Sequence, residues 1–528
     1  MHRRAFLRNG LILGGTAAGS NLLGWTVPAA GALAAEERGP GPYGPLDSRF
    51  PDDNGLVLPE GFSSRIVAVG GSAVGDTGYA WPLFPDGKGT FPMSDGGWIL
   101  ACNHEVFDFQ TPSGPSGGAS AIRFAADGSI TGAWPILSGS HSNSRGAATP
   151  WGTWLSCQEA FGGDGRIWEC DPTGGSPAVP RTALGVRTHG SVAVDAIGGH
   201  CYMTEAHRDG RFYRFTMLDE SLSGAALTDG PLEAMVVDPG GGVTWISVPD
   251  PTGTAAPTRV QAADGFVTPM GGGVAVHDGT MVFTTGLDDR VHSVDLAAGH
   301  HSVVWDGSGR RSPLFGIGDL AVAGSWDLFV TEDRGDMEVV VVTPSGPVAP
   351  FCRMVGNAHR FSEVTGPCFD PSGDRLYVSS LRGRGEALVR DVVPDLDWGA
   401  GAEGRHVGVT YEITGPFRST APMSGVGSTT VSPTTLVVPT TPVVPSTITT
   451  VVPSTTATAA TTTGVPSTTV PRSGNGPDPG SAAGSVGPTS GAAGSVVPLG
   501  LGAAAVLAVG GGALAVRRRR EARDRGAE

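Results

Sequence analysis

Acidic side chains recur at one position of a repeated sequence pattern. The pattern is a turn rich in Asp, Ser and Gly, then alternating apolar residues, then a small or polar residue and often a carboxylate. Four copies end in glutamate, at Glu105, Glu159, Glu205 and Glu332, and Asp333 directly follows the last of these. Carboxylates that converge repel one another unless a cation lies among them, so this repetition predicts a metal site.

Three further side chains fall near these positions. Alternation along a strand places Cys157 on the same face as Glu159, while His189 and Glu363 open the strands just before the third and sixth copies. Oxygen ligands suit Ca²⁺ and other hard ions, whereas a thiolate shifts the preference toward a transition metal such as iron. Each of these residues also has a structural alternative. Cys157 could be a buried thiol that binds no metal. His189 and Glu363 could form ordinary hydrogen bonds and act neither as ligands nor as acid–base groups.

The sixth copy lacks a carboxylate and has two arginines close by. Arg382 and Arg384 could hold a phosphate group by forked hydrogen bonds, and a solvated loop is the alternative. The sequence contains no Walker loop and no Cys-x-x-Cys pair, and no catalytic nucleophile is assigned. The spacing of the six cysteines dictates no disulfide pairs.

The six copies of the pattern are the elements that must position these side chains. Their Gly-rich turns and short strands predict an all-β fold, a six-bladed β-propeller over residues 40–418. We expect the strands of the copies to line the central channel, and residues 62–68 and 408–413 to close the ring. The copies read SDGGWILACNHE, TPWGTWLSCQE, DAIGGHCYMTE, HDGTMVFTTG, AGSWDLFVTE and PSGDRLYVSSL.

The ends of the chain predict export and anchoring. Residues 1–35 have a basic start, an apolar run and a small-residue site, which together indicate a signal peptide. Its Arg3-Arg4-Ala5-Phe6-Leu7 segment resembles the twin-arginine motif for export of folded proteins, with a general secretory signal as the alternative. Residues 419–495, rich in Thr, Ser and Pro, predict a disordered stalk.

An uncharged apolar segment lies near the C-terminus. Residues 496–516 are long enough to span a bilayer as a helix, and a run of four arginines follows directly within the basic tail, residues 517–528. Positive charge stays cytoplasmic, so this order predicts that the propeller lies outside the cell. A cleaved sorting tail is the alternative. The net charge of -15 argues against nucleic-acid binding, and we expect a monomer.

Several segments resemble the PhoX family of secreted, twin-arginine-exported alkaline phosphatases. They are TPWGTWLSCQEA, YMTEAHRDGRFYRF, LFVTEDRGD and SEVTGPCFDPSGDRLYVS, and the resemblance covers about residues 40 to 418. It implies a six-bladed propeller that hydrolyses small phosphate esters with a Ca²⁺ and Fe³⁺ cluster on its axis. By this resemblance, Cys157 matches an iron ligand and His189 the histidine that opens the third blade. The motif carboxylates match at Glu159, Glu205, Glu332 and Glu363.

The sequence departs from the family motifs at several of these positions. Gln158, Gly190 and Ala206 stand where an acid is usual, Arg334 follows Asp333, and the fourth copy lacks a glutamate. Two hypotheses therefore stay open: a metal-dependent phosphatase at the cell surface, or a catalytically reduced propeller that acts as a surface binding module. A third is a Ca²⁺ propeller that hydrolyses another ester, such as a lactone.

Overall fold

The computed structural model divides the chain into two compact units, residues 1–429 and 430–528. It describes residues 41–46, 50–107, 117–160, 162–219, 223–307, 312, 314–333, 336–344, 348–356, 359, 362–383 and 407–418. The predicted signal peptide, stalk and transmembrane segment lie outside the described residues, and so does Arg384. No helix within the described ranges is long and apolar enough to cross a membrane.

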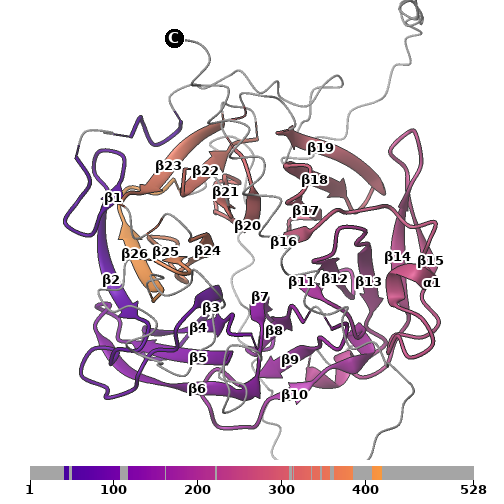
Figure 1. The fold of residues 1–528 in the computed structure, drawn as a ribbon, viewed down its shortest axis with the longest axis horizontal. Helices are drawn as coiled ribbons and strands as arrows, with labels where there is room; N and C mark the ends of the chain where they lie inside the picture. The colour runs from indigo at the N-terminus through magenta and orange to yellow at the C-terminus, as the bar shows by residue number, and fades with distance from the viewer. Residues whose placement is uncertain are drawn as a thin grey trace, which may run out of the picture. The chain divides into compact units, whose positions relative to one another are not determined.

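The described strands form six antiparallel sheets arranged as blades around a central axis (Figure 1). The prediction of an all-β, six-bladed propeller is therefore confirmed. Blade 1 contains β3 (Pro85–Pro92), β4 (Trp98–His104), β5 (Gly117–Phe124) and β6 (Ile130–Ser140). Blade 2 contains β7 (Asn143–Ala148), β8 (Trp154–Gln158), β9 (Ile167–Cys170) and β10 (Val179–Pro180). Blade 3 contains β11 (His189–Asp195), β12 (His200–Glu205), β13 (Phe212–Thr216), β14 (Leu232–Val237) and β15 (Val243–Ser247).

The remaining blades follow the same order. Blade 4 contains β16 (Gly271–His277), β17 (Thr280–Thr285), β18 (Arg290–Asp295) and β19 (His300–Asp306). Blade 5 contains β20 (Ile317–Val322), β21 (Leu328–Glu332), β22 (Glu338–Val342), β23 (Val348–Met354) and the short β1 (Leu56–Val57). Blade 6 contains β24 (Val364–Phe369), β25 (Arg375–Ser380), β26 (Val409–Thr414) and β2 (Ser63–Val69). Short helical turns connect some strands: η2 (Thr182–Leu184), η3 (Gly224–Leu227) and α1 (Thr258–Gln261).

The innermost strands are not the strands of the repeated pattern. β3, β7, β11, β16, β20 and β24 contact one another in this order, and β24 returns to β3. The repeat strands β4, β8, β12, β17, β21 and β25 are the second strand of each blade. The expectation that the repeats line the channel is therefore wrong, because each blade begins with a strand that precedes its repeat.

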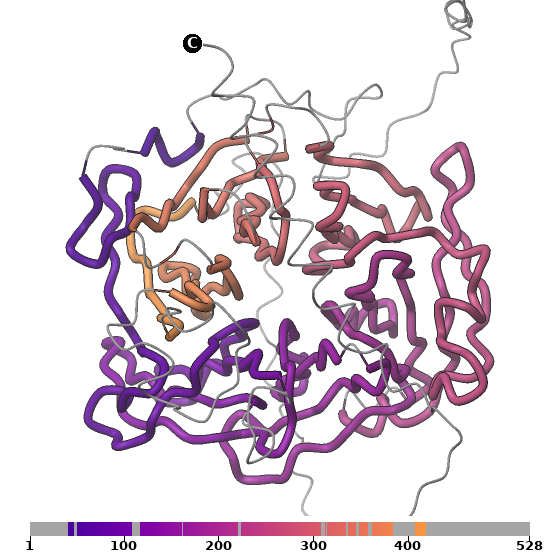
Figure 2. The backbone as a smooth tube through the Cα atoms, viewed as in Figure 1, coloured from indigo at the N-terminus to yellow at the C-terminus, as the bar shows by residue number. Residues whose placement is uncertain are grey.

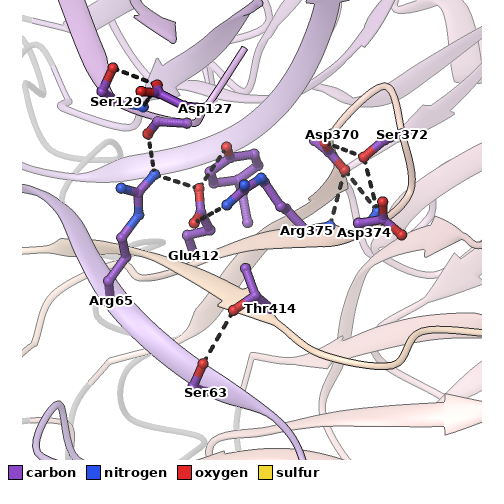
Figure 3. A network of polar contacts seen from close by, with 12 residues as sticks. Ser63, Arg65, Asp127, Ser129, Asp370, Ser372, Asp374, Arg375, Glu412 and Thr414 are labelled. Atoms are coloured by element: carbon purple, nitrogen blue, oxygen red, sulfur yellow. Dashed lines mark hydrogen bonds and ion pairs between the residues drawn. The ribbon is translucent and has the colours of Figure 1, made fainter. Parts of the chain in front are cut away.

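The two ends of the propeller meet in one sheet. β2 from the N-terminal side pairs antiparallel with β26 from the C-terminal side, as predicted, and the indigo and orange segments run side by side (Figure 2). Glu412 of β26 is 2% exposed and accepts hydrogen bonds from Arg65 and Arg375, both at 2.8 Å (Figure 3). It also accepts one from the Tyr377 hydroxyl at 2.9 Å. This network joins β2, β26 and β25 and so fastens the ring closure.

Apolar side chains fill each of the six interfaces between neighbouring blades. The cluster between blades 2 and 3, for example, contains Leu155, Ile167, Val192 and Met203. The equivalent clusters join blades 1 and 2, 3 and 4, 4 and 5, 5 and 6, and 6 and 1. Each such side chain contributes about 1.5–3 kcal/mol through burial. The propeller therefore has a ring-shaped core, and its axis is left for polar groups.

Candidate active site on the propeller axis

A β-bulge interrupts the innermost strand close to its start in all six blades, one residue later in blade 6 than in the others. It lies between the following residue pairs: Pro85 and Lys88, Asn143 and Gly146, His189 and Val192, Gly271 and Val274, Ile317 and Leu320, and Thr365 and Cys368. A bulge leaves residues outside the regular pairing and redirects their side chains. In three blades the residues within it are charged: Asp86, Arg145 and Asp319.

The charges of these three bulge residues act on one another. Charge interactions link Arg145 of blade 2 with Asp86 of blade 1 and with Asp319 of blade 5. Blades 2 and 5 are not neighbours in the ring, so Asp319 reaches Arg145 only across the axis. Lys88, at the end of the first bulge, donates to the Asp86 carbonyl oxygen at 2.7 Å and is buried.

The residue that follows each second strand marks one rim of the channel. Its backbone N–H donates to the carbonyl oxygen of the residue directly before the innermost strand of the same blade. These donors are Glu105, Glu159, Ala206, Gly286, Asp333 and Leu381, and their acceptors are Phe84, Ser142, Thr188, Met270, Gly316 and Glu363. By this criterion Glu105, Glu159 and Asp333 are equivalent, whereas Glu205 and Glu332 come one residue too early.

The predicted register of four glutamates is therefore wrong in blades 3 and 5. Successive side chains of a strand point to opposite faces, so a shift of one residue turns a side chain away from the axis. Glu205 instead accepts hydrogen bonds from the Tyr213 hydroxyl at 2.8 Å and from Arg259 at 3.0 Å. Glu332 accepts backbone N–H groups of Phe315 at 3.0 Å and Asp336 at 3.1 Å. Both are occupied with structural contacts within their own blades.

Nine charged residues from blades 1, 2, 5 and 6 form what we call the axial cluster. They are Asp86, Lys88, Glu105, Arg145, Glu159, Asp319, Asp333, Glu363 and Arg382, and charge interactions link them into one group. Of the predicted metal ligands it contains Glu105, Glu159, Asp333 and Glu363. Six carboxylates and three cations make up the cluster, so it has an excess of negative charge when all are ionised.

Arginines contact three of the axial carboxylates directly. Arg382 donates to Glu105 at 2.6 Å and also to Glu363. Arg145 lies 3.5 Å from Glu159. The side chain of Glu363 is 27% exposed, and those of Arg145 and Arg382 are 15% and 11% exposed, whereas the whole of Asp86 is only 3% exposed. Solvent therefore reaches the cluster from the side of Glu363.

Burial and mutual repulsion disfavour ionisation of these carboxyl groups. Burial raises the pKa of Asp86 and of Glu105, and neighbouring carboxylates add to both shifts. It raises the pKa of Glu159 to about 7 and that of Asp319 to about 6. Burial opposes ionisation of Glu363 too, but Arg382 holds the pKa of this group below its usual value.

Blades 3 and 4 bring glycine backbone to the axis in place of charge. A Cβ on Gly190 would collide with the Gly271 carbonyl oxygen and would lie 2.6 Å from the Thr204 hydroxyl. A Cβ on Gly273 would lie 2.7 Å from the backbone nitrogen of Leu320. Neighbouring innermost strands approach so closely here that no side chain fits, which explains why an acid is missing at position 190.

The two remaining predicted ligands lie beside the axial cluster. Cys157 is fully buried in the apolar cluster of blades 2 and 3, and burial raises the pKa of its thiol. The charges of Arg145, Asp319 and Glu159 act on it, so it borders the axial residues. His189 is buried, and its Nε2 lies 2.9 Å from the Gly185 carbonyl oxygen. Their roles as metal ligands stay predictions.

Four members of the axial cluster were missed by sequence reasoning: Asp86, Lys88, Arg145 and Asp319. Arg382 was expected to bind phosphate and lies in the cluster. The bulge segments PDGK, NSRG, HGSV, GGGV, IGDL and TGPC share a small residue at their second or third position. This recurrence upstream of each repeat was a signal that could have marked the innermost strands.

The donor chemistry of the axial cluster fits hard cations such as Ca²⁺. It is dominated by carboxylate oxygens, and Oδ1 of buried Asp86 has no hydrogen-bond partner among the described residues. As the side chains stand, no group of three or more His, Cys, Asp or Glu in the described ranges is placed to hold a metal ion. The guanidinium groups of Arg145 and Arg382 lie among these carboxylates instead.

Comparisons with known proteins agree with the sequence resemblance. The model of the family Alkaline phosphatase PhoX matches residues 108–269. The structure of Pseudomonas fluorescens PhoX in complex with vanadate, a transition state analogue, is 16% identical with a TM-score of 0.53. That similarity covers 69% of this chain and 96% of the Pseudomonas chain. No curated protein sequence matches the chain.

Two other solved structures are less similar to this chain. Regucalcin from Agrobacterium tumefaciens, a calcium-binding protein, is 16% identical with a TM-score of 0.33, over 68% of this chain and 97% of its own. A gluconolactonase from Xanthomonas campestris is 11% identical with a TM-score of 0.35, over 68% of this chain and 89% of its own. The match over residues 108–269 and the fold shared with PhoX confirm the resemblance of this chain to the PhoX alkaline phosphatase family.

Proposed function

We propose that this chain is a metal-dependent hydrolase of phosphate esters, with its active site in the axial cluster. The observation that carries this proposal is the meeting of buried carboxylates and two arginines on the axis of a propeller that matches the alkaline phosphatase PhoX family. Phosphoryl transfer depends mainly on positioning and on neutralising charge, and this cluster contains groups for both tasks.

The residues divide this work by their chemistry. We assign cation binding to Glu105, Glu159, Asp333 and Glu363, with Asp86 and Asp319 beside them. Ca²⁺ and Fe³⁺ are the ions that the family resemblance implies, and they would neutralise charge on the phosphoryl oxygens. Arg382 and Arg145 are assigned to the free oxygens of the ester, because a guanidinium matches phosphate with two parallel hydrogen bonds.

A metal-dependence assay tests this function. The purified full-length protein is treated with chelator, then given Ca²⁺, Fe³⁺ or both, and its hydrolysis of an aryl phosphate is followed. We expect activity that needs added metal and that falls at least tenfold in Glu159→Ala. Glu233→Ala is the matched control, because Glu233 pairs with Arg214 on outer strands of blade 3 and should keep full activity. No hydrolysis by the metal-loaded wild type would contradict the proposal.

We propose that the propeller acts outside the cell, as a monomer anchored by the C-terminal segment. The basis is the sequence of residues 1–35 and 496–520. All six cysteines are unpaired, and five of them are buried. Thiols buried by folding are protected from oxidation, which favours export of an already folded protein. Protease treatment of intact producing cells should release the propeller, and propeller found only in the cytoplasm would contradict this location.

A non-catalytic binding module is the second candidate function. It is favoured by the direct pairing of the axial carboxylates with Arg145 and Arg382, and by the absence of acids from the rim positions of blades 3 and 4. Under this hypothesis the metal-loaded protein would bind inorganic phosphate without hydrolysing esters. The aryl phosphate assay and a phosphate titration on the same sample separate the two candidates.

A further inference from the structure

Arg382 connects two blades through their carboxylates. One of its Nη atoms donates to Glu105 of blade 1 at 2.6 Å, and the other donates to Glu363 of blade 6. Its backbone N–H donates to the Ser362 hydroxyl at 2.8 Å, so the main chain is held independently of the side-chain ion pairs. The same guanidinium thus occupies two of the carboxylates that are assigned to cation binding.

Arg145 is held more loosely by its neighbours. Its Nη1 lies 3.5 Å from Glu159 and 3.4 Å from the Ser144 hydroxyl, both at the limit of a hydrogen bond. Its buried Nε has no hydrogen-bond partner among the described residues. A buried donor without an acceptor is destabilising, so this side chain lacks a partner that the site could supply.

A guanidinium and a metal ion compete for the same carboxylate oxygens, so the binding of one weakens the binding of the other. A cation on Glu105 and Glu363 would place like charges next to Arg382, and such contacts repel strongly in a buried site. A displaced guanidinium needs another anion, and a phosphate group offers several oxygens in the geometry that arginine prefers. Both arginine side chains keep some exposed area, 15% for Arg145 and 11% for Arg382, so a ligand from solvent can reach them.

We propose that Arg145 and Arg382 are exchangeable counter-ions that couple cation binding to phosphate binding. In the metal-free protein they neutralise the axial carboxylates, and in the metal-loaded protein they leave these carboxylates and bind the phosphoryl oxygens. The inference rests on the proposed function, and it names the preferred ligand as a phosphate group with several free oxygens. Lys88 stays in place, because it donates to the Asp86 carbonyl oxygen and not to a carboxylate.

Calcium titration of the full-length protein tests the exchange without any turnover. We expect Arg382→Ala and Arg145→Ala to bind Ca²⁺ at least tenfold more tightly than wild type in calorimetry, because a competing cation is removed. In chelator, both variants should melt at a lower temperature than wild type, and saturating Ca²⁺ should abolish this difference. Arg382→Gln serves as a second variant that keeps hydrogen-bonding capacity if the alanine form does not fold.

The matched control is Arg353→Ala on the outer strand of blade 5. Arg353 also pairs with a buried glutamate, Glu338, which is 2% exposed. Its loss should lower the melting temperature equally with and without Ca²⁺ and should leave Ca²⁺ affinity unchanged. Unchanged or weaker Ca²⁺ binding in the axial variants would overturn the proposal, and so would an absence of Ca²⁺ binding in every form.

Inorganic phosphate tests whether the arginines bind phosphate once Ca²⁺ occupies the carboxylates. Wild type should bind phosphate at least tenfold more tightly with Ca²⁺ than in chelator, and Arg382→Ala should lose this gain. Phosphate binding that is independent of Ca²⁺ would overturn the coupling. Ca²⁺-dependent phosphate binding in a protein that hydrolyses no ester would support the exchange and contradict the proposed enzymatic function. The failure of one proposal can therefore be told from the failure of the other.

Discussion

His189 and Glu205 are direct cross-strand partners in blade 3. This pairing places Glu205 one residue before the rim position, which Ala206 occupies in blade 3 and Glu159 in blade 2. Two glutamates that look alike in the sequence therefore have different surroundings. Glu159 belongs to the axial cluster, and Glu205 anchors Tyr213 and Arg259 within its blade.

Replacing each glutamate by glutamine should separate these two roles. Glu205→Gln neutralises a fully buried carboxylate whose partner Arg259 is 26% exposed, so we expect the free energy of unfolding to fall by about 2 kcal/mol with unchanged kcat. Glu159→Gln should reduce kcat/KM at least tenfold and change stability less. Urea unfolding and an aryl phosphate assay measure both quantities. A loss of activity in the folded Glu205 variant would contradict the register that the structure shows.

The sequence was sufficient for the fold but not for the membership of the site. Turn residues and alternating apolar positions repeat in every blade, so six blades and their closure could be predicted. The axial side chains depend on the bulges in the innermost strands, and a bulge leaves little trace in hydrophobic alternation. Asp86, Arg145 and Asp319 were missed for this reason, whereas Arg382 was found because it follows a repeat.

Close backbone packing at the axis predicts an intolerance to side chains in blade 3. In Gly190→Ala the new methyl group would meet the Gly271 carbonyl oxygen, so we expect a loss of about 2–3 kcal/mol in the free energy of unfolding. Gly324→Ala is the matched control, because a Cβ there meets no atom within 4 Å and should change stability by less than about 0.5 kcal/mol. Equal stability of the two variants would show that the innermost strands are less tightly packed.

Ring closure should depend on the Glu412 network (Figure 3). Glu412→Gln leaves Arg375 and Tyr377 with a neutral partner at a buried position, so we expect a loss of about 2 kcal/mol or more, measured by urea unfolding. Glu233→Gln removes a more exposed pair with Arg214, in which both side chains are 22% exposed, and should cost less than about 1 kcal/mol. If both variants lost equal stability, Glu412 would have no special role in closure.

A histidine pair in blade 4 predicts a pH dependence of stability. The Nδ1 of His292 lies 3.0 Å from Nε2 of His301, and burial lowers the pKa of His301 to about 4 and that of His292 well below its usual value. The folded state thus prefers neutral rings. Their contribution is complete above the unfolded pKa of about 6.5 and is lost as the pH falls toward 4.

Removing one ring should therefore reduce acid sensitivity. Between pH 7 and pH 4.5, His301→Gln should lose about 2 kcal/mol less stability than wild type in urea unfolding. His277→Gln is the control, because the His277 side chain is 38% exposed, and its pH profile should follow wild type. A His301 variant with the wild-type profile would show that this pair does not govern the acid response.

The chemistry of the site was predictable only where the relevant residues lie on the repeats. Glu105, Glu159 and Asp333 share a structural position, and the sequence could indicate it through their place at the end of each copy. Glu205 and Glu332 look equivalent to them in the sequence because the repeated pattern tolerates a shift of one residue, whereas backbone hydrogen bonding does not. Gly190 was noted as a departure, and its cause became clear only from the approach of Gly271 in the next blade.

Metal and phosphate binding in the axial cluster is tested most directly by an anomalous difference map from crystals of the full-length protein grown with Ca²⁺ and inorganic phosphate. We expect metal density among Glu105, Glu159, Asp333 and Glu363, with Arg382 turned from Glu105 to the phosphate oxygens. Metal bound at Glu205 or Glu332, or phosphate bound away from the axis with Arg382 still on Glu105, would contradict this expectation.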